Sequence, residues 1–121
     1  MQFNHERPIY LQIKEKLYRL MAGGNFSPGQ QLPSVRELAL ELKVNPNTVQ
    51  RAYRELETED LLFTRRGQGT FMTEEIKKIS HLRKKIAEES ALTFVQTAFS
   101  LGLKKKDIKD LLHEIIEEEG I

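Results

Sequence analysis

The 121-residue sequence predicts a mainly α-helical fold that contains one small β-hairpin. Apolar residues recur every three or four positions in several segments, which is the spacing that gives a helix one buried face. Two short β-prone runs flank a Gly-containing turn between Leu62 and Thr73, which is the pattern of a hairpin. Residues with strong capping or turn preferences separate these segments, so each is expected to form an element of its own.

The composition is that of a soluble globular protein, with 39% hydrophobic and 31% charged residues. The absence of Cys excludes disulfides and thiolate metal sites. The N-terminus lacks the apolar run of a signal peptide, and no stretch approaches the roughly 18 apolar residues needed to cross a bilayer. These features predict a cytoplasmic protein with no membrane partner. The net charge is only +1, so binding to nucleic acid would require the basic residues to gather on one face.

Two helices are predicted before residue 43. Pro8 opens the first, since its missing N–H costs nothing at a helix start, and Gly23 stops the apolar periodicity. Ser34 is a favourable N-cap of the second, and Glu37 three residues later completes a capping box. The predicted buried positions are Ile9, Ile13, Leu17, Leu20 and Met21 in the first helix and Val35, Leu38, Ala39 and Leu42 in the second.

A third helix follows a break of three residues, 43–45. Asn45 is expected to cap it and Pro46 to be its first residue. Its apolar stripe consists of Val49, Ala52, Tyr53 and Leu56. From Leu61 the pattern changes to two predicted strands, 62–65 and 70–73, joined by the basic turn 66–69.

Two more helices are predicted at the C-terminus. The longer begins at Glu74 and ends at Gly102, and the last runs from about Lys105 to Glu119. The natural boundary lies near Thr73. The sequence thus predicts a domain of residues 1–73, followed by a two-helix segment of residues 74–121.

The predicted order of elements is that of a winged helix-turn-helix: two short helices joined by a three-residue break, and then a basic hairpin. In that arrangement the third helix enters the major groove of double-stranded DNA, and the hairpin lies along the backbone or minor groove. Asn and Gln side chains can read adenine, Arg can read guanine, and Thr reaches phosphate or base. The candidate DNA-binding residues are Ser34, Arg36, Asn45, Asn47, Thr48, Gln50, Arg51, Arg54, Arg65, Arg66, Gly67 and Gln68.

The five arginines of this set are expected to converge on one surface, which would supply the charge that phosphate binding needs. The acidic residues of the third helix lie in its C-terminal half, away from the end that enters the groove. Purely structural roles compete with these assignments. Asn45 is expected to act as a helix cap in any case, Gly67 and Gly69 serve the turn, and a single Arg51 or Arg54 could be a solvated charge.

No enzyme is predicted. The sequence has no nucleophile motif and no phosphate-binding Gly loop, so no catalytic residue, cofactor or metal site is assigned. His5, His81 and His113 are isolated and have no partner at metal-ligand spacing. A non-regulatory protein-interaction module built on the same scaffold is the alternative. The polar face of the third helix, with Asn47 and Gln50, argues against it.

Ordered blocks over roughly residues 8 to 73 resemble the N-terminal DNA-binding signature of the GntR family of transcriptional regulators. The blocks are residues 8–13 (PIYLQI), 28–29 (PG), 32–39 (LPSVRELA), 45–49 (NPNTV), 52–53 (AY), 56–57 (LE) and 66–71 (RGQGTF). By this resemblance, the family's DNA contacts fall at Arg36, Asn45, Asn47, Thr48, Gln50, Arg66 and Gly67. The family usually has Gly where Asp60 stands here, and Asp tolerates the left-handed conformation better than most residues.

The two C-terminal helices resemble the short, YtrA-like branch of the family, whose members have a two-helix dimerisation segment. Two helices cannot enclose a core alone, so their apolar stripes must meet the DNA-binding domain or a partner subunit. The candidate dimerisation residues are Ile79, Leu82, Ile86, Phe94, Val95, Phe99, Ile108, Leu111, Leu112, Ile115 and Ile116.

A homodimer would present two recognition helices to the half-sites of a palindromic operator. The favoured expectation is a repressor, because blocking a promoter needs no activation surface. The resemblance also implies control of a transporter operon. A small-molecule effector is a further candidate partner, and the sequence does not identify its chemistry.

Overall fold

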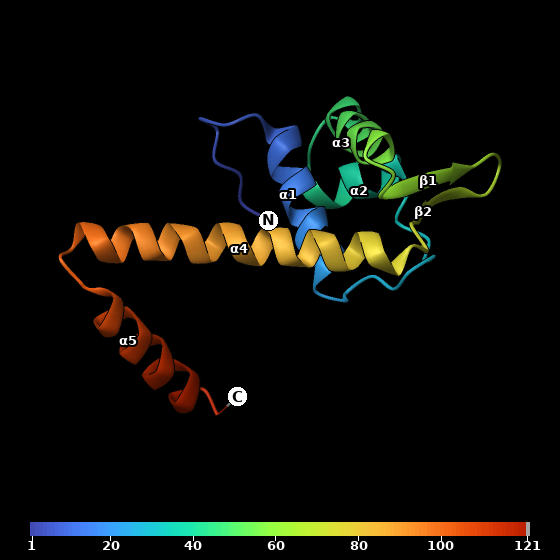
Figure 1. Ribbon diagram of the computed structural model, residues 1–121. Helices are drawn as coiled ribbons and strands as arrows, with labels where there is room; N and C mark the ends of the chain where they lie inside the picture. Colours follow the sequence, from blue (N-terminus) through green and yellow to red (C-terminus); the bar gives the residue numbers. More distant parts are fainter. Residues whose placement is uncertain (121) are drawn as a thin grey trace. The chain divides into compact units, whose positions relative to one another are not determined.

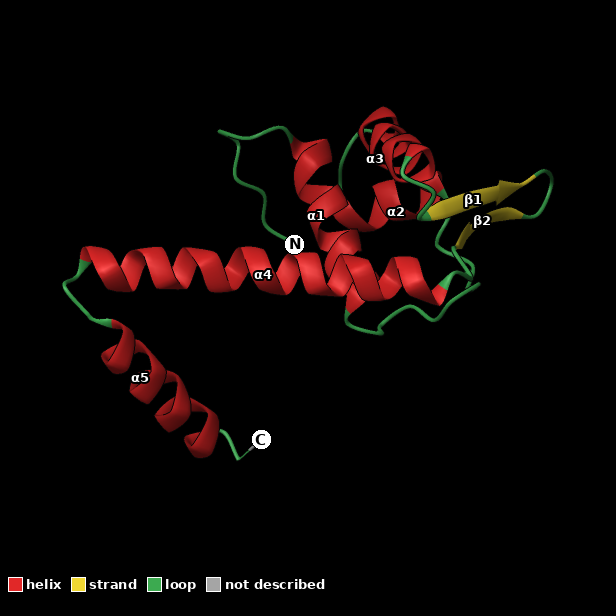
Figure 2. Ribbon diagram, viewed as in Figure 1, coloured by secondary structure: helices red, strands yellow, loops and turns green. Residues whose placement is uncertain are grey.

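A computed structural model describes residues 1–120 and consists of five helices and a two-stranded hairpin (Figures 1 and 2). This confirms the predicted mainly α fold with a small β-hairpin. The elements are α1 (Ile9–Ala22), α2 (Val35–Leu42), α3 (Pro46–Thr58), β1 (Leu62–Arg65), β2 (Gly69–Met72), α4 (Ile76–Ser100) and α5 (Lys105–Glu118).

The chain forms two compact units, Met1–Lys84 and a second that begins at Lys85. The N-terminal unit includes the first turns of α4 and so continues past Thr73, the predicted boundary. Ile79 and Leu82 are buried in it, and Arg83 donates from Nε to the carbonyl oxygen of Ala22 at 2.8 Å. These contacts fasten the beginning of α4 to the end of α1.

The core of the N-terminal unit lies between α1, α2 and α3. Every residue of the apolar stripe predicted for α3 is at most 1% exposed. Burial of this stripe removes one whole face of the helix from water and leaves the opposite face available. The largest fully buried side chains of the unit are Tyr53, Ile13, Met21, Leu56, Met72 and Val49.

A tight turn joins α2 to α3 over the predicted three-residue break. Lys43 ends α2 in the left-handed conformation, with φ 58° and ψ 48°, and Val44 donates its N–H to the carbonyl of Ala39 at 3.0 Å. Asp60, after the end of α3, also has a positive φ of 60°. The conformation expected where the family usually has Gly is therefore present.

The hairpin is antiparallel, with Phe63 opposite Phe71 and Arg65 opposite Gly69. The second strand therefore begins at Gly69 instead of Thr70, because Gly69 still pairs across the ladder. It ends at Met72 instead of Thr73, whose N–H bonds to Leu61 outside the ladder at 2.9 Å. The Thr73 hydroxyl accepts the N–H of Glu75 at 3.1 Å, and α4 begins after it, at Ile76 instead of Glu74.

The C-terminal unit contains the remainder of α4 and the whole of α5. Ala98 and Ile108 are its buried apolar residues. Among residues 1–120, no helix is long and apolar enough to cross a membrane.

Candidate nucleic-acid interface

The N-terminal end of α3 is fixed by its cap. The Oδ1 atom of Asn45 accepts the N–H of Asn47 at 2.8 Å, and Pro46 is the first helical residue. The structure thus confirms the predicted cap. Because the apolar stripe faces the core, the opposite face carries the predicted reading residues. Asn47, Gln50, Arg51 and Arg54 are exposed, and Thr48 is half-buried.

The start of α2 is also capped. The Ser34 hydroxyl accepts the N–H of Glu37 at 3.1 Å, and the Glu37 carboxylate accepts the N–H of Ser34 at 3.2 Å, which forms the predicted capping box. Arg36 is exposed in the first turn of α2. The Tyr53 hydroxyl donates to the carbonyl of Pro33 at 2.6 Å and so ties α3 to the residues that precede α2. Burial, with smaller contributions from Glu37 and Glu41, raises the pKa of Tyr53, so this donor stays protonated.

The hairpin turn holds the predicted wing residues at one end of the ladder (Figure 1). Gly67 has a φ of 78°, a conformation that favours glycine. The Gln31 side chain donates from Nε2 to the carbonyl of Gln68 at 2.7 Å, and this bond ties the hairpin turn to the segment that precedes α2. The Arg65 guanidinium carbon lies 5.4 Å and 5.5 Å from the ring centroids of Phe63 and Phe71.

Most of the predicted arginines carry unneutralised charge. Within residues 1–120, the exposed side chains of Arg36, Arg54 and Arg66 make no ion pair. Lys14 of α1 pairs with two acidic residues, since it donates to Glu55 of α3 at 2.8 Å and lies 3.1 Å from Glu59, the C-cap of that helix. These pairs neutralise carboxylates close to the face that would meet an anionic ligand.

Sequence reasoning missed a row of polar contacts that joins α1 to α3. Tyr10, Lys14 and Tyr18 follow one another at intervals of four residues on α1. They contact Arg51, Glu55 and Glu59, which have the same spacing along α3 and its C-cap. Two polar stripes of identical period on neighbouring helices were the available signal. Ile9, Tyr10, Asn47, Thr48 and Arg51 together line a shallow hollow of about 310 Å³.

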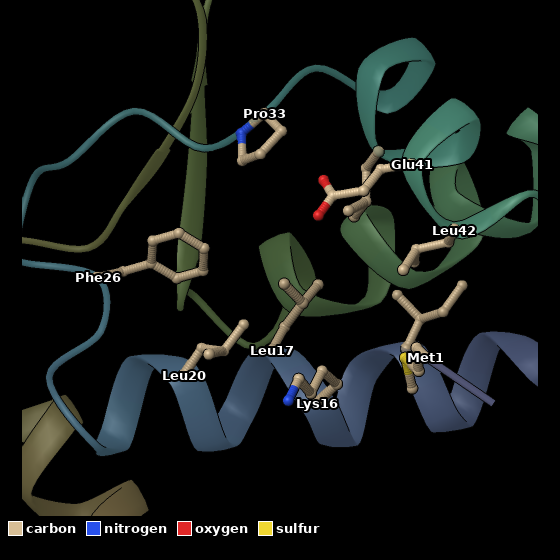
Figure 3. A pocket seen from close by; sticks show the side chains of 10 residues that line it. Met1, Lys16, Leu17, Leu20, Phe26, Pro33, Glu41 and Leu42 are labelled. Carbon is tan, nitrogen blue, oxygen red and sulfur yellow. The ribbon is translucent and has the colours of Figure 1, made fainter. Parts of the chain in front are cut away.

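A larger hollow of about 470 Å³ lies between α1 and α2 (Figure 3). Its walls are mainly apolar, and Lys16 of α1 and Glu41 of α2 are its charged lining residues. The charges of Lys16 and Glu41 cancel, so this lining lacks the net positive charge that DNA binding requires. The residues that line this larger hollow are Met1, Ile13, Lys16, Leu17, Leu20, Phe26, Pro33, Leu38, Glu41 and Leu42.

The candidate nucleic-acid interface is therefore the exposed face of α3 together with the hairpin turn.

Comparison with known sequences places this arrangement among transcriptional regulators. The family model described as "Bacterial regulatory proteins, gntR family" matches residues 9–72. The HTH-type transcriptional regulator YhcF of Bacillus subtilis strain 168 is 43% identical over 107 residues, which cover 88% of each chain. The HTH-type transcriptional repressor YtrA of the same organism is 50% identical over 70 residues, covering 58% of this chain and 54% of YtrA. Both relatives are short regulators, which confirms the resemblance to this branch and the prediction that the protein is not an enzyme.

Solved structures agree. A GntR family transcriptional regulator from Listeria monocytogenes superposes with a TM-score of 0.86 at 38% identity, covering 93% of this chain and 98% of that one. The AraR DNA-binding domain, solved in complex with an operator, has a TM-score of 0.54 at 29% identity, covering 60% of this chain and 88% of that domain. The winged helix-turn-helix fold is thereby confirmed, in a form that binds operator DNA in AraR. The chain belongs to the gntR family of bacterial regulatory proteins.

Proposed function

We propose that this regulator binds a palindromic operator as a homodimer and represses transcription from it in the cytoplasm. The carrying observation is the capped N-terminal end of α3, which presents Asn47, Gln50 and Arg51 on the face opposite the buried stripe. A helix end held in this way can enter the major groove without first having to be ordered.

The proposal divides the interface into two kinds of contact. Asn47 and Gln50 read base edges, since side-chain amides match the donor and acceptor pattern of adenine. Arg36, Arg54 and the turn residues Arg66 and Gly67 contact phosphate, where their charge or their exposed backbone N–H groups fix the register on the duplex. Ser34, Asn45, Thr48, Arg65 and Gln68 complete the proposed interface.

The homodimer is proposed to form through the unit that begins at Lys85. Apolar side chains remain exposed in this unit because the rest of α4 and α5 cannot cover them. Examples are Phe99 and Ile116, each 49% exposed. Ile79 and Leu82 are covered within the N-terminal unit, at 5% and 9% exposure, and have little surface left for a second chain. The proposed contact therefore rests on the half-buried or exposed residues Ile86, Phe94, Val95, Phe99, Leu111, Leu112, Ile115 and Ile116, with Ile108 beneath them.

Repression is supported by YtrA, a named repressor that is 50% identical over 58% of this chain. A transporter operon as the target follows from the resemblance alone. A small-molecule effector, if one binds, would act by changing the distance or angle between the two DNA-binding units, because half-site spacing sets the affinity of a dimer.

Selection of bound duplexes from a random pool tests the proposal in one step. The full chain should recover a twofold-symmetric site with half-sites about one helical turn, or a multiple of it, apart. Binding should weaken steeply as salt is raised, because phosphate contacts release counterions. Recovery of no preferred sequence, together with capture of a protein partner, would instead support the interaction-module alternative.

Truncation tests the dimer separately. A chain of residues 1–84 retains Ile79, Leu82 and the Arg83 bond to Ala22, so it should fold. We expect it to be monomeric in sedimentation, and to bind the selected site at least about 100-fold more weakly, since the second half-site loses its tethered partner. A full-length monomer at micromolar concentration, or a truncated chain that still dimerises, would rule out this part of the proposal.

A further inference from the structure

Arg51 is exposed but held in one place. Its side chain is 58% exposed, yet its guanidinium carbon lies 3.7 Å from the centroid of the Tyr10 ring. Its Nη2 atom also donates to the Tyr10 hydroxyl at 3.0 Å. The two residues are 41 positions apart and belong to α1 and α3. An exposed Arg ordinarily samples many rotamers, so a ring and a hydroxyl acting together restrict it strongly.

A competing partner for Arg51 is present on its own helix. Glu55, one turn further along α3, accepts from Arg51 Nε at 3.4 Å. That contact is longer than the bond from Lys14 of α1 to the other carboxylate oxygen of Glu55, which is 2.8 Å. The hydrogen bond from Lys14, more than the bond from Arg51, holds the pKa of Glu55 below its ordinary value. Lys14 is thus the nearer partner of this carboxylate, and Arg51 makes only a long contact to it.

The held guanidinium lies beside the end of α3 that is proposed to enter the groove. Tyr10 and Arg51 share the lining of one shallow hollow with Asn47 and Thr48, which belong to the first turn of that helix. A phosphate placed at this hollow would meet the Arg51 guanidinium, which the Tyr10 ring and hydroxyl hold there. Arg side chains are common donors to the DNA backbone.

We propose that Tyr10 is a positioning residue for DNA binding, which holds the Arg51 guanidinium ready for a backbone phosphate beside the recognition helix. The proposal rests on the proposed function, because it assigns a role within the same interface. Its physical basis is preorganisation. An arginine that is already ordered loses less conformational entropy when it binds than one that is free.

The test compares Tyr10→Leu, Tyr10→Phe, Arg51→Ala and the double variant Tyr10→Leu/Arg51→Ala in the full chain. Affinity is measured for the selected duplex and for a random duplex over a range of salt concentrations. Tyr18→Leu is the matched control, since Tyr18 lies on α1 two turns further along and bonds to Glu59 instead of Arg51. Thermal unfolding checks that each variant is folded, and Tyr10→Phe, which keeps the ring, carries the test if Tyr10→Leu does not fold.

Tyr10→Leu should weaken binding to both duplexes by about two- to fivefold, the range expected for a surface cation–π contact. Arg51→Ala should weaken binding further and lower the salt slope by about one unit. In the Arg51→Ala background, Tyr10→Leu should change nothing more, because its effect passes through Arg51. Tyr18→Leu should bind both duplexes like the wild type.

The proposal would be overturned if the double variant lost affinity by the product of the two single-variant losses. It would also be overturned if both Tyr10 variants bound DNA like the wild type. Wild-type binding by Arg51→Ala would overturn it as well. In each of these cases the unmodified chain still binds its selected site, so the proposed function stands. If the unmodified chain binds no DNA, the proposed function itself fails, and the two failures are distinguishable.

Discussion

The turn between α2 and α3 carries a conformational cost that a single substitution should remove. Lys43 has a φ of 58° in the left-handed region, where the Cβ atom of an L residue approaches its own backbone. Its side chain is exposed and makes no ion pair with any described residue. Lys43→Gly therefore removes the strain without breaking a side-chain contact.

The magnitude follows from two opposing effects. The left-handed conformation costs a residue with a Cβ atom about 1–2 kcal/mol. Glycine offsets about 0.5–1 kcal/mol of this gain in stability, because it loses more backbone entropy on folding. The net expectation is that Lys43→Gly raises the free energy of unfolding by about 0.5–1 kcal/mol. Asp60→Gly should gain less, since Asp tolerates this conformation and the change also removes an exposed ion pair with Lys78 at 3.4 Å.

Thermal and urea unfolding at one fixed protein concentration measures the effect, because association makes the midpoint depend on concentration. Lys43→Gly should raise the melting temperature by about 2–6 °C. Lys43→Ala is the control, since it removes the same side chain but keeps the Cβ atom, and it should not stabilise. Equal stabilisation by Gly and Ala, or destabilisation by Gly, would refute the attribution to backbone strain.

Three further predictions concern the interface and the core. Asn47→Ala should weaken binding to the selected site by about 1–3 kcal/mol but leave binding to random duplex unchanged in a gel-shift titration, because the base contact alone is lost. Arg66→Ala should weaken binding to both duplexes and lower the salt slope by about one unit, and an unchanged slope would count against a phosphate contact at the hairpin turn. Leu56→Ala should lower the free energy of unfolding by about 2–5 kcal/mol in urea, since Leu56 is 0% exposed, and a folded variant that fails to bind DNA would contradict a purely structural role.

Local chemistry made much of the fold predictable. The capping box of Ser34 and Glu37 and the cap at Asn45 depend on residues within three positions of one another, and the structure contains all of these bonds. The left-handed conformation at Asp60 was anticipated from the position where the family usually has Gly. The caps follow from short-range hydrogen bonding, which a single sequence displays directly, whereas the expectation at Asp60 needed the resemblance to the family.

Contacts between distant segments were not predictable in the same way. Periodicity identified the apolar face of α4, but it does not tell which surface covers that face. Ile79 and Leu82 were assigned to a dimer contact, yet both are buried within the N-terminal unit. The pairing of Tyr10 with Arg51 was missed for a related reason, because the four-residue spacing on each helix does not tell that α1 and α3 pack with these two stripes together.

The same distinction explains how the two parts of the interface are kept together. Four consecutive residues, 31–34, form hydrogen bonds to the hairpin, to α3 and to the start of α2. Gln31 bonds to the carbonyl of Gln68 in the hairpin turn, and Leu32 donates its N–H to Thr70 at 2.8 Å. Pro33 accepts the Tyr53 hydroxyl of α3, and Ser34 caps α2. A short extended segment, stiffened by proline, thus bonds the recognition helix and the hairpin to a common support. A direct hydrogen bond from Thr64 of β1 to Glu57 of α3 adds to this support, so both sets of bonds fix the proposed base-reading and phosphate-contacting residues relative to one another.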